Sequence, residues 1–166
     1  MKASVLELQP GDSVNWSDFE QSLHDRFGVN AVALQPNGER RTQGALLPAN
    51  DICRIIKESL KAESAICATL KRRLLHTVRT RKRYAADECD AGIYRLIMPV
   101  LLADAIEGFI SVCGRPFSTT DRLYPETIHR ATAEGERRIR SLLPTLRPIG
   151  PRELKEIRLF ISEFAH

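Results

Sequence analysis

The sequence lacks a long apolar run, and it has few aromatic residues. Its longest uncharged apolar run, LIMPVLLA, is too short to span a bilayer. The first residues, MKASVLELQPGDSVNW, have neither the basic start nor the apolar centre of a signal peptide. Aromatic residues make up only 6% of the chain, which argues against a stacking platform for single-stranded nucleic acid. We therefore expect a soluble, cytoplasmic protein without a membrane partner.

The sequence also lacks the common catalytic and nucleotide-binding motifs. It contains no P-loop, no G-x-G-x-x-G, no H-E-x-x-H and no nucleophile elbow. Its 4 histidines are scattered along the chain. We therefore do not expect an enzyme, unless the cysteines support redox chemistry.

What the sequence does have is the composition of a globular protein. Hydrophobic residues account for 43% of its 166 residues and charged residues for 28%. This length suffices for a single domain with a buried core, and we expect one domain over residues 1–166. The net charge of +4 is mildly basic and does not by itself indicate a nucleic-acid partner.

The basic residues are unevenly distributed. Seven of them fall between positions 71 and 83: Lys71, Arg72, Arg73, Arg79, Arg81, Lys82 and Arg83. They form either a solvated helix face or a surface for an anion, a nucleic acid or an acidic protein.

Helical periodicity marks the first half of the chain. NWSDFEQSLHDRFG predicts a helix with Ser17 as N-cap, Glu20 as its capping-box partner and Gly28 as the stop. NDICRIIKESL predicts a helix capped by Asn50 or Asp51, and another begins at about residue 64. Between them, VNAVALQPNGERRTQGALL predicts a β-hairpin around PNGE.

The second half begins with the clearest strand signal. AGIYRLIMPVLLADAIEGFISVCG predicts two antiparallel strands around ADA, with a bulge at Pro99. Helical spacing then runs from residue 128 to 146, and a last helix begins at Pro151. Its apolar seam packs on its own domain or on a second copy. Antiparallel strands with helices before, between and after them predict an α+β fold.

The order of these segments resembles the PocR sensory domain of bacterial and archaeal signalling proteins. The resemblance covers roughly residues 16–113 and rests on FGVNAVALQPNGERR, NDICRIIKES and CDAGIYRLIMPVLLADAIEGFISVCG. Its most specific parts are the C-x-A-G-hydrophobic motif at 89–93, the following MPV, and the G-F-I…C-G at 108–114.

The resemblance implies a PAS- or GAF-like fold with a central antiparallel sheet flanked by helices. It implies a core at about 16–117 and a helical extension at about 121–165. Such domains sense small molecules, and we place the ligand pocket at Gly92, Tyr94, Phe109 and Ser111. Because no DNA-binding or kinase segment follows the core, we expect a separate output protein or self-association through the C-terminal helices.

The four cysteines, Cys53, Cys67, Cys89 and Cys113, match cysteines of the family and of a stand-alone branch within it. The resemblance implies that they could bind an iron–sulfur cluster, with zinc as the alternative. The residues alone leave core packing, a metal site and a redox pair open, since no C-x2–4-C knuckle is present. Arg95 and Arg115 could balance the charge of a cluster. The acidic neighbours of Cys89 disfavour its thiolate, and hence a nucleophilic role.

We therefore expect a sensory domain in signal transduction or transcriptional regulation. Two alternatives remain. One is an adaptor that binds nucleic acid or an acidic partner through residues 71–83, with nucleic acid the less favoured. The other is a small redox enzyme or electron-transfer protein that uses the cysteines.

Overall fold

The fold is organised around a five-stranded sheet. The computed structural model describes residues 3–45, 47–117 and 125–165. Two long strands, β4 (Tyr94–Leu102) and β5 (Ala105–Arg115), form the centre of the sheet. The shorter strand β2 (Asn30–Leu34) pairs antiparallel with β5. On the other side, β1 (Leu6–Leu8) runs parallel and β3 (Ala85–Glu88) antiparallel to β4.

The β4–β5 hairpin confirms the clearest strand prediction. Its two turn residues, Ala103 and Asp104, have φ of 47° and 63°, as a type I′ turn requires. The register shifts just after Pro99, between Val100 and Leu101. β3 pairs with β4 up to Ile97, and β1 begins to pair at Val100. Pro99 therefore lies in the gap between two short edge strands, where a missing N–H is tolerated.

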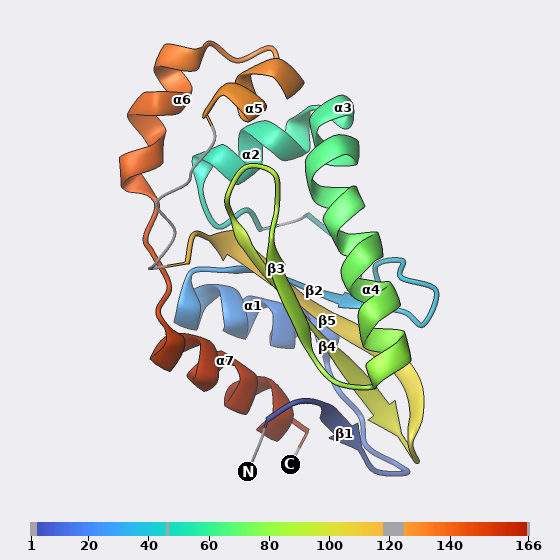
Figure 1. The fold of residues 1–166 in the computed structure, drawn as a ribbon. Helices are drawn as coiled ribbons and strands as arrows, with labels where there is room; N and C mark the ends of the chain where they lie inside the picture. Colours follow the sequence, from blue (N-terminus) through green and yellow to red (C-terminus); the bar gives the residue numbers. More distant parts are fainter. Residues whose placement is uncertain (1–2, 46, 118–124, 166) are drawn as a thin grey trace.

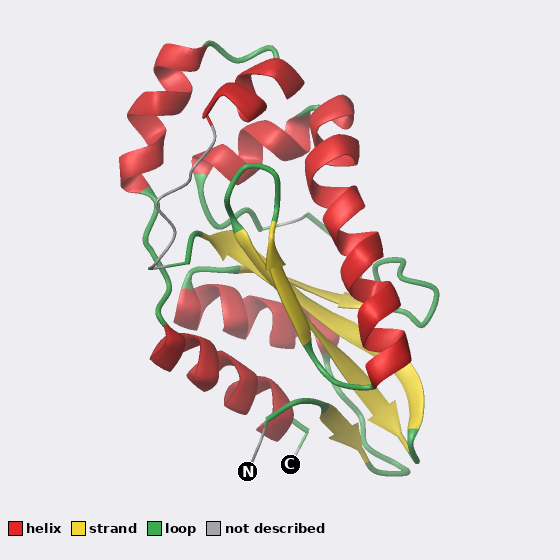
Figure 2. Ribbon diagram, in the orientation of Figure 1, coloured by secondary structure: helices red, strands yellow, loops and turns green. Residues whose placement is uncertain are grey.

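Helices cover both faces of this sheet and one of its ends (Figures 1 and 2). One face carries α1 (Trp16–Phe27) and α7 (Pro151–Glu163), and the other carries α4 (Thr69–Arg81). The end carries α2 (Asp51–Glu58), α3 (Leu60–Ala62), α5 (Pro125–Ala131) and α6 (Glu136–Leu142). This arrangement is the α+β architecture that the sequence predicts.

Several local predictions were wrong. Asn15, not Ser17, caps α1, because its side chain accepts the N–H of Asp18. The return strand of the first predicted hairpin shrinks to one bridge, between Leu34 and Arg40. The edge strands β1 and β3 were not predicted, because each is too short to show periodicity.

The helical boundaries differ as well. The helix that contains residue 64 begins at Leu60 and passes through a π-helical segment, Glu63–Ala68, before α4. The predicted helix over 128–146 is broken at 132–135, and the described residues after Phe117 form three α-helices rather than two. Residues 121–124 of the predicted extension lie outside the described residues.

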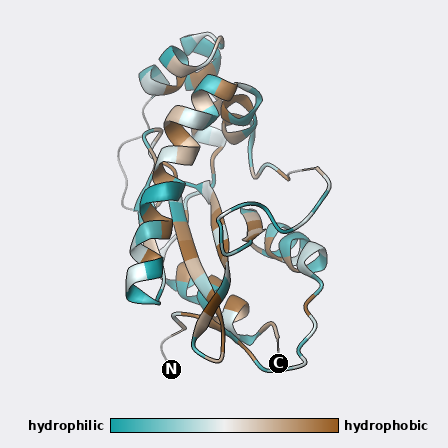
Figure 3. Ribbon diagram, turned by 90° about the vertical axis from the view of Figure 1, so that its right-hand side faces the viewer, coloured by the Kyte–Doolittle hydropathy of each residue, from teal (hydrophilic) through white to brown (hydrophobic). Residues whose placement is uncertain are grey.

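The sheet is apolar at its centre (Figure 3), and the packing of α7 completes the core on one face. Leu154, Ile157 and Ile161 of α7 pack with α1 against β4 and β5. The seam of the last helix therefore packs on its own domain, the first of the two alternatives. In the part of the chain that the structure describes, no helix is both long and apolar enough to cross a membrane.

Glu20 joins α1 to the sheet, although the sequence assigns it to a capping box. Its side chain is buried and accepts hydrogen bonds from Ala33 N and Thr42 Oγ1, both at 2.8 Å. Arg40 Nη2 lies 3.2 Å from its other oxygen. One carboxylate thus fixes β2 and the segment that follows it.

Glu20→Ala should lower the free energy of unfolding by about 3 kcal/mol, because it leaves buried donors without an acceptor. Urea denaturation measures this loss. The matched control is Gln21→Ala, an exposed neighbour on the same helix, which should change stability by less than about 0.5 kcal/mol. Equal midpoints for the two variants would contradict this role of Glu20.

Candidate functional site

The structure brings the four cysteines to one end of the sheet. Cys53 lies in α2, Cys67 in the π-helical segment, Cys89 in the turn between β3 and β4, and Cys113 near the end of β5. All four are unpaired and line one small cavity of about 20 Å³. Among the described residues, no three His, Cys, Asp or Glu side chains are placed so as to hold a single metal ion.

The register of the sheet determines the surroundings of Cys113. This residue lies opposite Arg95 of β4 on one side and opposite Asn30 of β2 on the other. Directly opposed residues point to the same face of a sheet, so both side chains reach the sulfur. Arg95 Nη2 lies 3.5 Å from Cys113 Sγ, and Asn30 Nδ2 lies 3.9 Å from it. Two donors are therefore directed at this sulfur.

A bulge at Gly114 brings α2 to the same place. The β4–β5 register shifts there, and Gly114 has a φ of 107°. A Cβ at this position would lie 2.6 Å from Ala49 Cβ, so only glycine fits. Asn50 Nδ2 donates to the Gly114 carbonyl, while Asn50 Oδ1 accepts the N–H of Cys53 at 2.8 Å. The predicted cap Asn50 thus both starts α2 and fixes Cys53 next to β5.

Arg95 also holds the π-helical segment. Its Nη1 donates to the carbonyl of Cys67 at 3.2 Å. π-Helical turns often mark functional sites, because they alter the regular i→i−4 ladder. Arg95 is only 7% exposed and forms no salt bridge with a carboxylate of the described residues. A buried guanidinium without an acidic partner is costly unless another anion faces it.

Cys89 lies in a tight turn that Gly92 makes possible. Its N–H donates to Ile93 O, and its carbonyl accepts from Gly92 N, both at 2.8 Å. Gly92 has a φ of 85°, which favours glycine. Burial raises the pKa of Cys89 to about 11, and the backbone N–H groups of Ile93 and Ala91 oppose this rise. The thiolate is disfavoured as the sequence predicts, but the main cause is burial.

The other three thiols differ in their acidity. Burial and then the neighbouring Cys113 raise the pKa of Cys53 far above its ordinary value. Burial also raises the pKa of Cys67, against the opposing charges of Lys57 and Arg95. At Cys113 burial acts in the same sense, but Arg95 and Lys57 outweigh it, and its pKa lies below the ordinary value.

A second, larger cavity adjoins the first. Its volume is about 170 Å³, and it shares Lys57, Cys67 and Arg95 with the cysteine cavity. The rest of its lining is Val32, Leu34, Arg40, Glu63, Ala68, Lys71 and Ser111. Burial and then the charge of Arg95 lower the pKa of Lys71. This cavity is therefore a region of positive potential with an apolar wall.

The four residues predicted as a ligand pocket do not converge. Ser111 lines the second cavity. Phe109 is fully buried in the core between α4 and the sheet. Tyr94 stacks on Phe117 with ring centroids 5.6 Å apart, beside a groove between α4 and β3. Gly92 serves the turn of Cys89.

The predicted basic surface is divided between several sides of α4 and the loop after it. Lys71 turns toward the second cavity and donates to Gly38 O at 3.3 Å. Arg79 donates a hydrogen bond to the backbone carbonyl of Pro36, and Lys82 donates one to that of Asp104. The groove beside β3 is lined by Arg73, Arg81 and Arg83, and Arg72 is exposed. Binding of an acidic partner through these residues stays a prediction.

Arg115 has a structural role instead of the predicted one beside a cluster. It is buried and forms a 2.7 Å salt bridge with Glu153 of α7. It also donates to the carbonyls of Phe27, Arg147 and Pro148. All its partners lie in α1, α7 and the segment before α7, so it joins these elements and not the cysteine site.

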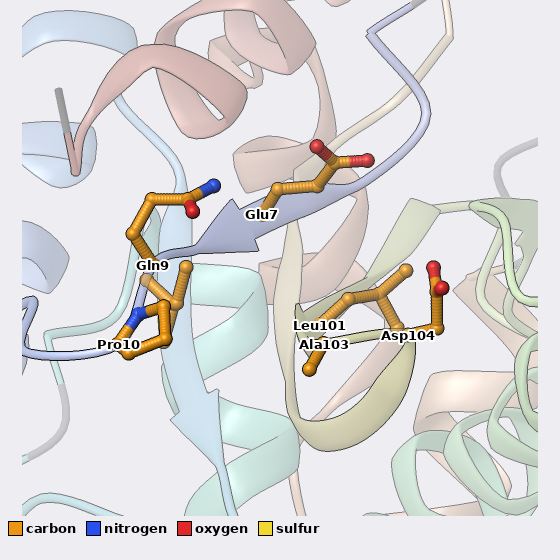
Figure 4. A pocket seen from close by; sticks show the side chains of 7 residues that line it. Glu7, Gln9, Pro10, Leu101, Ala103 and Asp104 are labelled. Carbon is orange, nitrogen blue, oxygen red and sulfur yellow. The ribbon is translucent and has the colours of Figure 1, made fainter.

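A further pocket lies at the opposite end of the central hairpin. Figure 4 shows Glu7, Gln9 and Pro10 on one side of it and Leu101, Ala103 and Asp104 on the other. Its volume is about 210 Å³, and its lining includes two carboxylates but no basic side chain. It has no lining residue in common with the cysteine cavity and is separate from it.

Sequence reasoning missed Asn30 and Lys57 as members of the site. Asn30 follows α1 at the start of β2, and only the pairing of β2 with β5 brings it to Cys113. Lys57 lies one helical turn after Cys53, so the i, i+4 spacing could have identified it.

Comparison with known families confirms the resemblance that the sequence shows. Residues 12–166, nearly the whole chain, match the family described as the sensory domain found in PocR. Searches of curated proteins and of solved structures found no match. The matched region includes the four cysteines, the central hairpin and the C-terminal helices. The chain therefore belongs to the family of PocR sensory domains, whose role is sensory signal transduction.

Proposed function

We propose that this sensory domain holds an iron–sulfur cluster through Cys53, Cys67, Cys89 and Cys113. The observation that carries the proposal is the convergence of four thiols, from four separate elements, on one cavity. Cysteine thiolates are the usual ligands of such clusters, which supply a centre that changes its redox state.

The electrostatics of the site support this ligand set. Four thiolates concentrate negative charge, and Arg95 and Lys57 lie in the same cavity lining without a carboxylate partner in the described residues. Hydrogen bonds to the sulfurs further stabilise thiolates and tune the potential of a cluster. Arg95 and Asn30 direct donors at Cys113, and backbone N–H groups favour the thiolate of Cys89.

The positions of the cysteines in the sequence favour a cluster over a structural zinc ion, since no C-x2–4-C knuckle is present. A zinc ion needs four ligand atoms at about 2.3 Å, whereas each cysteine of a cluster can bind a different iron. As the side chains of the described residues stand, no three His, Cys, Asp or Glu are placed to hold a metal, so either centre requires the thiols to move. A cavity of 20 Å³ has room for about one water-sized group, so the cysteine side chains must rotate outward around a cluster.

Protein purified without oxygen should show broad visible absorption, with iron and acid-labile sulfide in stoichiometric amounts. Each single Cys→Ala substitution should remove most of the iron, because the remaining thiols leave one position unligated. Ser162→Ala, a similarly small change on α7, is the matched control and should retain it. Zinc without visible absorption, or no metal in freshly purified protein, would contradict the cluster.

The sensory output would pass through the helices that cover the site. Cys53 and Cys67 pack in one cluster with Ile128 of α5 and Ile139 of α6. A change in charge or side-chain position at the thiols therefore acts directly on this packing. The C-terminal helices α5 and α6 are the elements that a separate output protein could bind.

Hydrogen exchange can test this coupling. Reduction of the centre should change the exchange of amides in 125–142 by at least about threefold, because its charge changes beside their packing contacts. The amides of α7 serve as the internal control, since this helix packs on the other face of the sheet. Equal changes of exchange in 125–142 and in α7, or no change in either, would contradict a specific coupling between the cysteine site and α5 and α6.

In the chain freed of metal, Cys113 should be alkylated first at neutral pH and Cys53 last. Since the pKa of Cys113 is lowered in the folded state, its thiolate persists at pH values where an ordinary thiol is protonated. The associated stabilisation is present above the ordinary thiol pKa and is lost as pH falls through the lowered one. Iodoacetamide labelling with peptide mass spectrometry measures the order.

Arg95→Gln should slow the labelling of Cys113 at neutral pH at least about tenfold, because it removes the nearest positive charge. Arg54→Gln, on the exposed side of α2, should leave the rate unchanged. Equal rates in the two variants would show that Arg95 does not activate this thiol.

A further inference from the structure

The second cavity has the features of a binding site for a small organic anion. Lys57, Lys71 and Arg95 line it, yet none of them forms a salt bridge with any described carboxylate. Glu63 is the one acidic residue of the lining, and it has no ion pair in the described part of the chain. Charged side chains that are partly or fully buried are normally balanced, and the single carboxylate of Glu63 does not balance three cations. The lining therefore keeps a net positive charge that a bound anion would neutralise.

The fourth basic residue of the lining, Arg40, adds no uncompensated positive charge. Arg40 is paired with Glu20 at 3.2 Å, so its charge is already compensated. Its buried Nε, however, has no hydrogen-bond partner. Ser111 is 5% exposed, and its hydroxyl makes no hydrogen bond with the described residues. The cavity therefore combines cations that have no salt bridge with two unused donors, the Nε–H of Arg40 and the hydroxyl of Ser111.

The size and the apolar wall of the cavity limit the ligand. At about 170 Å³ the cavity is slightly larger than one of about 150 Å³ that accommodates benzene. A ligand of about six non-hydrogen atoms therefore fits. Val32, Leu34 and Ala68 offer an apolar surface to part of it. A charged head group with a short hydrocarbon chain matches both parts of the lining.

We infer that this cavity binds a short-chain monocarboxylate. The carboxylate lies among Lys57, Lys71 and Ser111, and the hydrocarbon chain packs against Val32 and Leu34. This inference deepens the proposed function, because it names the class of ligand sensed beside the cysteines. Since Lys57, Cys67 and Arg95 line both cavities, the ligand charge acts directly on the cysteine site.

Calorimetric titration of the anaerobically purified full chain tests the inference with two matched probes, butyrate and its neutral isostere butyramide. Butyrate should bind at least about tenfold more tightly, because charge-assisted hydrogen bonds to the lysines require an anion. Equal affinity for the two probes would overturn the anion site, and binding of neither would overturn the cavity as a ligand site.

Variants locate the binding. Lys71→Gln should weaken butyrate binding at least about tenfold, whereas Lys61→Gln, on the exposed surface of α3, should not. Equal affinities of the two variants for butyrate would show that the anion binds outside this cavity. Iron and sulfide measured on the same samples report the cluster separately. A cluster without butyrate binding refutes only this inference, and butyrate binding without a cluster refutes only the proposed function.

Discussion

The pairing register of the β4–β5 hairpin is the constraint on which the rest of this structure depends. β1 and β3 pair with its first strand, β2 pairs with its second, and helices pack on both of its faces. The same register sets Arg95 opposite Cys113. A shift of β4 by one residue would turn Arg95 to the face of α1 and α7, away from Cys113, and would dismantle the cysteine site.

The buried Arg95 explains how the two cavities form one unit. It donates to the carbonyl of Cys67 and lies beside the sulfur of Cys113, so it joins the π-helical segment to the sheet. Because no described carboxylate neutralises it, its charge favours anions on both sides: thiolates in one cavity and a carboxylate in the other. The buried charge of Arg95 costs free energy unless an anion in one of the cavities balances it. Stability and function are thus coupled at this single side chain.

Long periodic segments were predictable from sequence, and short ones were not. The hairpin, the Asn50 cap, the Gly28 stop and the helix that contains Leu70 and Leu74 follow from spacing and turn chemistry. β1 and β3 were not predicted, since strands of three and four residues are too short to show a pattern and are stabilised by the strand they pair with. Glu20 was assigned to a helix cap, because nothing local reveals that β2 will supply a donor to it.

The sequence by itself determined the α+β class, the main helices, the central hairpin and the identity of the four cysteines as a set, because these depend on local periodicity and on family motifs. Only the tertiary structure decided that Lys57, Asn30 and Arg95 surround the thiols while Arg115 joins α7 to α1. It also separated the predicted pocket residues, leaving Ser111 beside the cations. The physical reason is that a charge acts on the groups nearest to it in space, and strand register, bulges and helix packing set those neighbours.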